Sequence, residues 1–150
     1  MASIEFVVPS SEAYEPAVSF ADPDRAQIPE ADAEAGIRLW ARHAGDADTP
    51  QLLQVRYPPA TTATAHAHEA DEIIFVTEGE LIFGRRHYGP GSSVHIPRET
   101  LYSFRAGAEG ATFLNFRPYR DDSVLSAAQV RDRRARRRDR SRAAFRASAR

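Results

Sequence analysis

The stretch His66-Ala67-His68-Glu69-Ala70-Asp71-Glu72-Ile73-Ile74-Phe75-Val76-Thr77-Glu78-Gly79 decides the fold of this 150-residue chain. It reads as the end of one short strand followed by the whole of the next. Side chains alternate between the two faces of a strand, so His66 and His68 share one face. By the same rule Glu72 shares a face with Ile74. If the two strands are neighbours, Glu72 reaches the histidine pair.

These three side chains form a candidate metal site. Two imidazoles and one carboxylate make the facial triad that suits a divalent metal, with further positions left for water or substrate. With five histidines in the chain, a chance His-x-His pair is unremarkable, and a lone strand Glu is usually solvated. All three together, between two turns, are much less common. Glu69 and Asp71 are expected to face the opposite way.

The chain around this stretch has a strand pattern. Turn residues recur about every ten positions, which predicts an all-β sandwich or barrel. Strands are expected at 37–43, 51–57, 64–68, 72–77, 80–84, 92–96, 101–105 and 111–117. Turns are expected at Pro58-Pro59, at 78–80, at 88–91 and at 107–110.

Both ends differ from this middle part. Residues 1–35 are acidic and carry prolines at 9, 16, 23 and 29, which predicts an extended arm with one strand at 4–8. Residues 118–150 form a basic tail, in which Asp122 or Ser123 is expected to cap a short helix. Its apolar stripe ends near residue 132, so the rest is expected to be solvated or disordered. The division expected is an arm (1–35), a β-barrel (36–117) and the tail (118–150).

The net charge of −1 hides a split between body and tail. Residues 117–150 hold 12 Arg against four Asp, a net +8, and residues 1–116 hold eight Arg against 17 acids, a net −9. Complementary charge predicts a salt-sensitive contact between tail and body, within or between subunits. We do not expect nucleic acid as a partner, because the body is acidic and no helix-turn-helix pattern precedes the tail.

Composition excludes several classes of protein. The chain has neither Cys nor Lys, which rules out disulfide scaffolds, thiolate metal sites and Schiff-base lysines. No apolar run is long enough to span a membrane, and no signal-type apolar segment follows Met1. We therefore expect a cytoplasmic protein.

The first stretch resembles the first motif of the cupin family, G-x5-H-x-H-x3-4-E-x6-G. His66, His68, Glu72 and Gly79 match it, and Ala60 replaces the first Gly. The resemblance covers residues 36–117 and implies a double-stranded β-helix, or jelly-roll barrel, flanked here by the extended arm and the short helix. It also implies a homodimer and a divalent metal.

The second cupin motif is less complete. Residues 89–97 resemble it, but the usual Asp is Ser92, and the usual His ligand aligns with Tyr102. Three interpretations stay open. In the first, the residues of the first motif alone hold the metal and Tyr102 lies nearby. In the second, Tyr102 binds the metal as a phenolate. In the third, metal binding is weak or lost. His95 and His87 are other nitrogens close in sequence, but both are expected at the surface.

The resemblance implies a small metal-dependent enzyme that acts on an oxygenated organic molecule. Fe(II) is favoured and points to dioxygenase-type chemistry at the 2-His-1-carboxylate site. Zn, Mn or Ni would support an isomerase, cyclase or lyase instead. A non-catalytic barrel that binds a small molecule is the alternative from a different class.

Further pocket residues follow from strand alternation. Phe113, Asn115 and Arg117 share one face of the last strand, and we favour it as pocket lining because it is one aromatic and two polar groups. An inward Arg56 would anchor a carboxylate or enolate. Candidate catalytic residues are Tyr102, as general acid or base, and Arg56; candidate substrate-binding residues are Gln54, Phe104, Phe113 and Asn115; candidate metal ligands are His66, His68 and Glu72.

Overall fold

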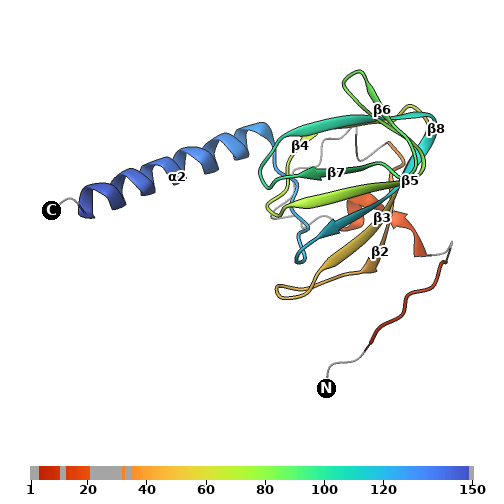
Figure 1. Cartoon of the computed structure of the whole chain (residues 1–150), viewed down its shortest axis with the longest axis horizontal. Helices are drawn as coiled ribbons and strands as arrows, with labels where there is room; N and C mark the ends of the chain where they lie inside the picture. The colour runs from red at the N-terminus through yellow and green to blue at the C-terminus, as the bar shows by residue number, and fades with distance from the viewer. Residues whose placement is uncertain (1–3, 11–12, 21–31, 33–34, 149–150) are drawn as a thin grey trace.

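The computed structural model describes residues 4–10, 13–20, 32 and 35–148. In these residues a β-barrel is followed by one helix that projects away from it (Figure 1). The elements in chain order are β1 (Glu15–Pro16), the 3-10 helix η2 (Ala17–Phe20), β2 (Arg38–His43), β3 (Gln51–Tyr57), β4 (Thr62–His66), β5 (Glu72–Phe83), β6 (Arg86–Tyr88), β7 (Ser93–Ile96), β8 (Tyr102–Arg117) and α2 (Ala127–Ser148).

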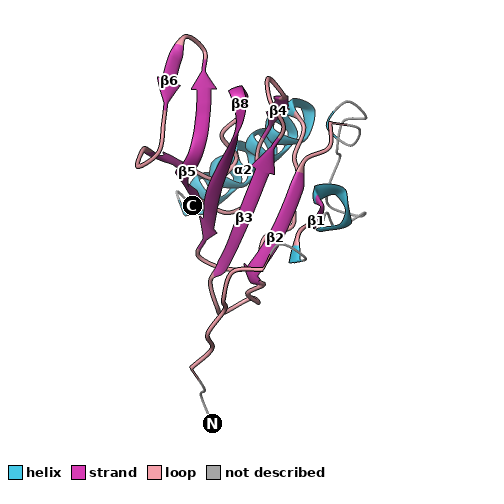
Figure 2. Ribbon diagram, turned by 90° about the vertical axis from the view of Figure 1, so that its right-hand side faces the viewer, coloured by secondary structure: helices cyan, strands magenta, loops and turns pink. Residues whose placement is uncertain are grey.

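Two long strands, β5 and β8, hold the barrel together. The first part of β5 pairs with the last part of β8 (Ile74 opposite Asn115), and its last part pairs with the first part of β8 (Ile82 opposite Arg105). The sheet order is β1-β2-β3-β8-β5-β6, with β4 on β8 and β7 on β5, and the pairs are antiparallel. Figure 2 shows β2, β3, β8 and β5 side by side. The fold is the expected all-β double-stranded β-helix.

The turns expected at 78–80 and 107–110 are wrong, because β5 and β8 run through both places as bent strands. Gly79 has φ 66° and Gly110 has φ 80°, values that residues with a Cβ rarely adopt. A Cβ on Gly79 would also collide with the carbonyl oxygen of Gly110. The glycines therefore mark β-bulges, at which two paired strands turn the corner of the barrel together. A further strand, β6, lies just before the turn expected at 88–91, where no strand was expected.

The strand expected at 4–8 is also wrong. This segment has no regular structure, and Ile4 and Phe6 are 83% and 85% exposed. Alternating apolar residues form a strand only where a sheet edge pairs with them, and in the described chain β1 takes the edge of β2 instead (Glu15 opposite Leu39). The prolines expected to extend the arm at 23 and 29 lie outside the described residues.

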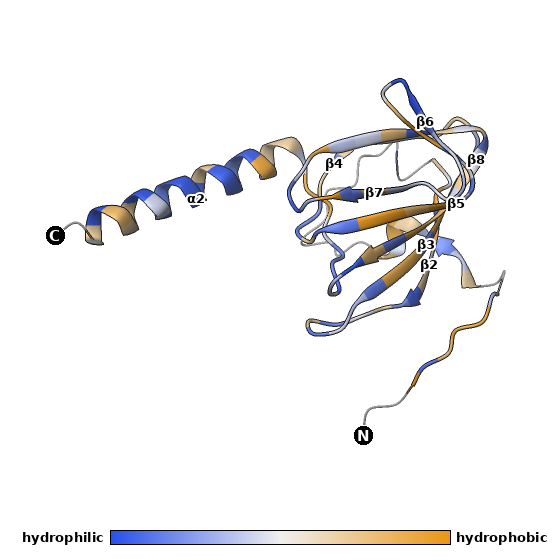
Figure 3. Cartoon of the chain, viewed as in Figure 1, coloured by the Kyte–Doolittle hydropathy of each residue, from blue (hydrophilic) through white to orange (hydrophobic). Residues whose placement is uncertain are grey.

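The C-terminal helix differs from its prediction in start and length. Ser126, rather than Asp122 or Ser123, caps it: Ser126 Oγ accepts from the Gln129 amide at 3.3 Å, and Gln129 Oε1 accepts from the Ser126 amide at 2.8 Å. The helix is 22 residues long rather than short. Its buried contact is confined to the start, where Val130 packs with Ala67 and with Leu125, which precedes the helix. Residues 134–147 are exposed and mostly hydrophilic, in agreement with a solvated tail (Figure 3).

The hydrophobic core fills the barrel from both walls. The largest core side chains are Ile37, Leu39, Leu53, Val55, Ile74, Val76, Leu81, Ile96, Phe104 and Phe113.

No helix in the described part of the chain is both long and apolar enough to cross a membrane.

Candidate functional site

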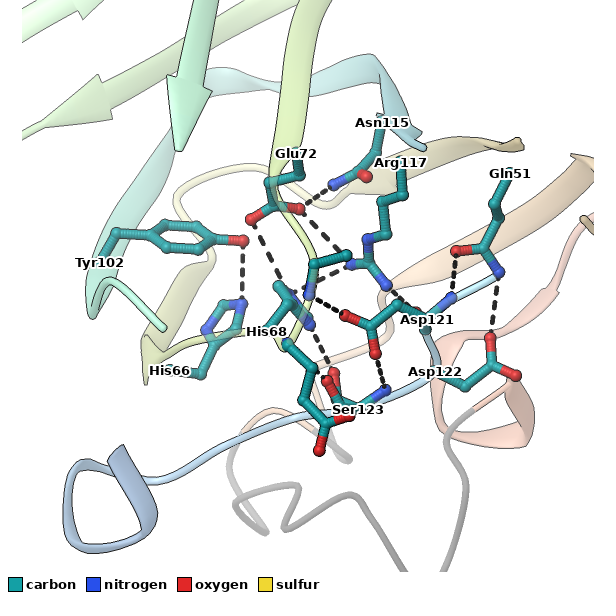
Figure 4. A network of polar contacts seen from close by, with 12 residues as sticks. Gln51, His66, His68, Glu72, Tyr102, Asn115, Arg117, Asp121, Asp122 and Ser123 are labelled. Carbon is teal, nitrogen blue, oxygen red and sulfur yellow. Dashed lines mark hydrogen bonds and ion pairs between the residues drawn. The ribbon is translucent and has the colours of Figure 1, made fainter. Parts of the chain in front are cut away.

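His66 and His68 lie where β4 ends (Figure 4). Between them Ala67 pairs with Leu125 through two backbone hydrogen bonds of 3.0 and 2.8 Å, which hold this segment extended. Alternate side chains of an extended segment lie on one side, and the two imidazole centroids are 5.0 Å apart. The structure thus brings the predicted histidine pair together.

Backbone carbonyls set the tautomer of both rings. His66 Nδ1 is 2.6 Å from the Thr64 carbonyl oxygen, and His68 Nδ1 bonds to the Ser123 carbonyl oxygen. A carbonyl only accepts, so each Nδ1 carries the proton and each Nε2 keeps a lone pair. Both Nε2 atoms turn to other polar side chains of the site: His66 Nε2 accepts from the Tyr102 hydroxyl at 3.1 Å. This is the orientation that metal-ligating histidines adopt.

Glu72 is the buried carboxylate of the site, with 2% of its surface exposed. Its Oε2 accepts from Asn115 Nδ2 at 2.6 Å and from Arg117 Nη2 at 3.4 Å. Its Oε1 has no hydrogen-bond partner among the described residues and lies 3.9 Å from His68 Nε2. Burial alone would raise the pKa of Glu72, but His68, Arg117 and the hydrogen bonds outweigh it and lower that pKa. Glu72 is therefore a carboxylate near neutral pH.

Arg117 sits among these groups and is 6% exposed. Its Nη2 is 3.2 Å from His68 Nε2, and its Nη1 donates to the Asp121 carbonyl oxygen. Burial, and then the positive charge of Arg117, lower the pKa of His68 to about 4. His68 is therefore neutral near pH 7, the form that binds a metal.

Tyr102 lines the same space beside His66, with ring centroids 4.6 Å apart. Burial, and then the negative charge of Glu72, raise the pKa of Tyr102 well above its usual value. Its hydroxyl keeps its proton and can donate a hydrogen bond to His66 Nε2, at 3.1 Å, or to the Glu72 carboxylate, but not to both at once. The residue that aligns with the usual cupin His ligand is therefore a hydrogen-bond donor in this structure.

A second set of polar residues, Asp121 and Ser123, supports the site from the segment before α2. Both are fully buried. Asp121 accepts from the Ala70 amide at 2.8 Å, and Ser123 Oγ accepts from the Glu69 amide at 2.9 Å. Sequence reasoning missed them, because a short polar run before an apolar stripe is also typical of a helix cap. Arg117 was placed on the favoured face but was given no role.

A cavity of about 150 Å³ opens beside these groups. Its walls are mainly apolar, and its polar lining groups include the two histidines. Such a composition is typical of sites for small organic molecules. The lining includes Leu53, Val55, Tyr57, His66, His68, Tyr102, Phe104, Phe113, Asn115 and Arg117.

Three of the four predicted substrate-binding residues line this cavity. Phe113 and Asn115 do so from the favoured face of β8, and Phe104 does so from the first part of the same strand. Phe104 contacts Phe113, with ring centroids 5.8 Å apart. Their roles toward a substrate stay predictions.

Gln54 and Arg56 lie on the other side of β3, so their expected place in the pocket is wrong. Leu53 and Val55 point inward, and alternation then turns their neighbours outward. Gln54 accepts from Arg42 at 3.1 Å, and Arg56 lies 3.9 Å above the Tyr14 ring. The buried arginine at the cavity is Arg117 instead.

The donors fit a divalent metal in type, and the two imidazoles also fit it in orientation. Two imidazoles whose Nδ1 atoms face carbonyl oxygens direct their Nε2 atoms into the site, and the buried Oε1 of Glu72 has no hydrogen-bond partner among the described residues. Within the same described part of the chain, however, no three His, Cys, Asp or Glu side chains are gathered closely enough to hold an ion. Glu72 is turned toward Asn115 and Arg117 instead, so a metal would require a side-chain adjustment.

Comparison with known proteins agrees with the fold. Residues 53–116 match the family model described as a cupin domain. Together, the barrel and this match identify residues 53–116, which are less than half of the chain, as similar to a cupin domain. No curated protein matches the sequence.

Several solved structures share the fold. One is KdgF from Halomonas sp., at 24% identity and TM-score 0.52, with 59% of this chain and 84% of that chain covered. Another is the polyketide cyclase RemF from Streptomyces resistomycificus, at 24% identity and TM-score 0.50, covering 61% and 70%. A third is an acetylacetone dioxygenase from Acinetobacter johnsonii, at 14% identity and TM-score 0.57, covering 78% and 76%.

Proposed function

We propose that this chain is a small metal-dependent cupin enzyme that acts on an oxygenated small organic molecule. One observation carries the proposal: backbone carbonyls fix both Nδ1 atoms, so His66 and His68 present Nε2 lone pairs beside the buried carboxylate of Glu72. These three residues would hold the metal beside the cavity, which His66 and His68 line.

The bound metal would supply the reactive centre, and Fe(II) with dioxygenase-type chemistry is our first choice at a 2-His-1-carboxylate site. Zn, Mn or Ni, with isomerase, cyclase or lyase chemistry, is the alternative. The fold suits either, since the similar structures include a dioxygenase and a cyclase.

The chain's own residues would bind and orient the substrate. Phe104 and Phe113 offer apolar surface that excludes water from the reacting end. The Tyr102 hydroxyl holds its proton, so it serves as a hydrogen-bond donor or general acid toward a substrate oxygen rather than as a base.

Metal analysis of protein purified without a His tag tests this proposal. After separate reconstitution with Fe(II), Zn, Mn and Ni, we expect about one bound metal per chain. His66→Ala and Glu72→Ala should lose most of it, and His95→Ala, at an exposed position on β7, is the matched control. Wild-type protein that takes up none of these metals would contradict the metalloenzyme proposal.

A non-catalytic barrel that binds a small molecule is the second candidate. Arg117 favours it, because its guanidinium already contacts His68 and Glu72. In that case a small organic molecule would bind to the cavity without any metal, and the reconstitution experiment separates the two.

A further inference from the structure

Arg117 occupies one nitrogen that the proposed metal would use, and it pairs with the carboxylate that would also bind the metal. Its Nη2 lies 3.2 Å from His68 Nε2 and 3.4 Å from Glu72 Oε2. The lone pair of His68 Nε2 accepts either an N–H donor or a metal ion, but not both at once. Binding at His68 therefore requires the Arg117 guanidinium to leave.

The charges of the buried groups point the same way. A buried guanidinium stays charged and needs a counter-charge, which Glu72 provides at 1% side-chain exposure. A divalent cation would take over that role for Glu72, and it would repel Arg117 at the same time. One cation would thus replace the other.

Arg117 also has a second anchor that does not involve the ligands. Its Nη1 donates to the Asp121 carbonyl oxygen, and the Asp121 carboxylate is near enough to be affected by its charge. Its Nε has no hydrogen-bond partner among the described residues. The guanidinium therefore has a nearby negative group to turn to when it releases His68.

We propose that Arg117 is a displaceable internal cation, which occupies His68 and Glu72 until a divalent metal replaces it. The inference rests on the proposed metal site and adds a determinant of its affinity. Arg117 makes metal binding weaker than the same ligands would allow, and it moves toward Asp121 on binding.

Zinc affinity, measured by competition with a chromophoric chelator, tests this. Arg117→Met removes the charge at similar length and should bind Zn(II) about tenfold more tightly than wild type or better. Arg117→Lys keeps a charge and should lie closer to wild type. Arg120→Met, at an exposed arginine paired with Asp122, is the matched control and should change little.

A measurement on wild-type protein covers the case in which Arg117→Met does not fold. Zn(II) titration followed by ¹⁵N NMR should shift the Arg117 guanidinium and His68 Nε2 signals together. Unchanged Arg117 signals on zinc binding, or folded Arg117→Met that binds no more tightly than wild type, would overturn the inference while leaving the metal site intact. Absence of zinc binding in wild type and all variants would overturn both.

Discussion

His68 shows how burial decides the chemistry of a single side chain. It is 8% exposed, its Nδ1 is fixed by the Ser123 carbonyl, and Arg117 lies beside its Nε2. Both ring nitrogens of neutral His68 therefore have partners inside the protein. A proton on Nε2 would put a second positive charge next to Arg117. In the unfolded chain the same ring is free to accept that proton.

This difference predicts an acid-sensitive stability. The pKa of His68 falls from 6.5 to about 4 on folding, so between these values the unfolded chain binds the extra proton. The free energy of unfolding should therefore decrease as pH drops from about 6.5 to about 4, by at most about 3 kcal/mol from this residue. Urea unfolding of chelator-treated protein measures it. His68→Gln should flatten this fall and exposed His95→Gln should not; equal slopes in all three proteins would contradict the assignment.

Tyr102 gives a second prediction at the same scale. Replacing it by His would supply the imidazole that most cupins have at this position, beside His66. Tyr102→His should tighten metal binding about tenfold or more, because a third imidazole is a better ligand than a protonated phenol. Tyr102→Phe, which removes the hydroxyl without adding a nitrogen, is the control. If the chelator competition gives the same affinity for both variants, position 102 lies outside the site.

The long strands β5 and β8 depend on their glycine corners. At Gly79 and Gly110 both strands bend, which lets each belong to both walls of the barrel and brings Glu72, at the start of β5, near the histidines at the end of β4. The corner is crowded, because the backbone of Gly110 occupies the space of a Cβ on Gly79.

Gly79→Ala should therefore cost more than a simple loss of flexibility. Positive φ alone costs an Ala about 1–2 kcal/mol, and the collision should raise the loss to about 3 kcal/mol or more. Gly84 separates the two effects, since it has φ 62° but nothing within 4 Å of an added Cβ. In urea unfolding, Gly84→Ala should show only the smaller loss. Equal losses for the two variants would show that the corner is not crowded.

At the scale of the whole molecule, the basic tail and the acidic body form ion pairs with each other within the chain. Arg133 pairs with Glu69, and Arg137 pairs with Glu99, whose amide donates to the His68 carbonyl at 2.8 Å. The basic helix is thus tied to the segment that carries the candidate ligands. Partly exposed pairs of this kind are weak singly and are screened by salt.

The homodimer implied by the resemblance stays a proposal, which a monomer in analytical ultracentrifugation would contradict.

Two truncations separate the docked part of the tail from the solvated part. Deleting residues 139–150 should change the free energy of unfolding by less than about 1 kcal/mol, because 139–147 are exposed. Deleting everything after Asp122 removes Ser123, Leu125 and Val130, all buried, and should cost about 4 kcal/mol or more. Thermal and urea unfolding of both proteins give these values. Nearly wild-type stability of the shorter protein would show that the 123–130 segment is not docked.

Sequence alone was sufficient for the features that depend on neighbours along the chain. Alternation placed His66 and His68 on one side, and turn residues located β2 and β3 to within a residue. Alternation defines two faces but does not say which is inward, so Phe113 was placed correctly, whereas Arg56 was not. Pairing between strands made that choice, because burial depends on which segments meet.

Only the tertiary structure decided how the site is completed. The carbonyl that orients His68 belongs to Ser123, and the cation beside it belongs to Arg117, both about fifty positions away along the chain. Local patterns carry no signal for contacts at that separation, and the polar run at 121–123 resembles a helix cap. The candidate ligands can thus be found in the sequence. The groups that orient, neutralise and compete for them appear only after the chain has folded.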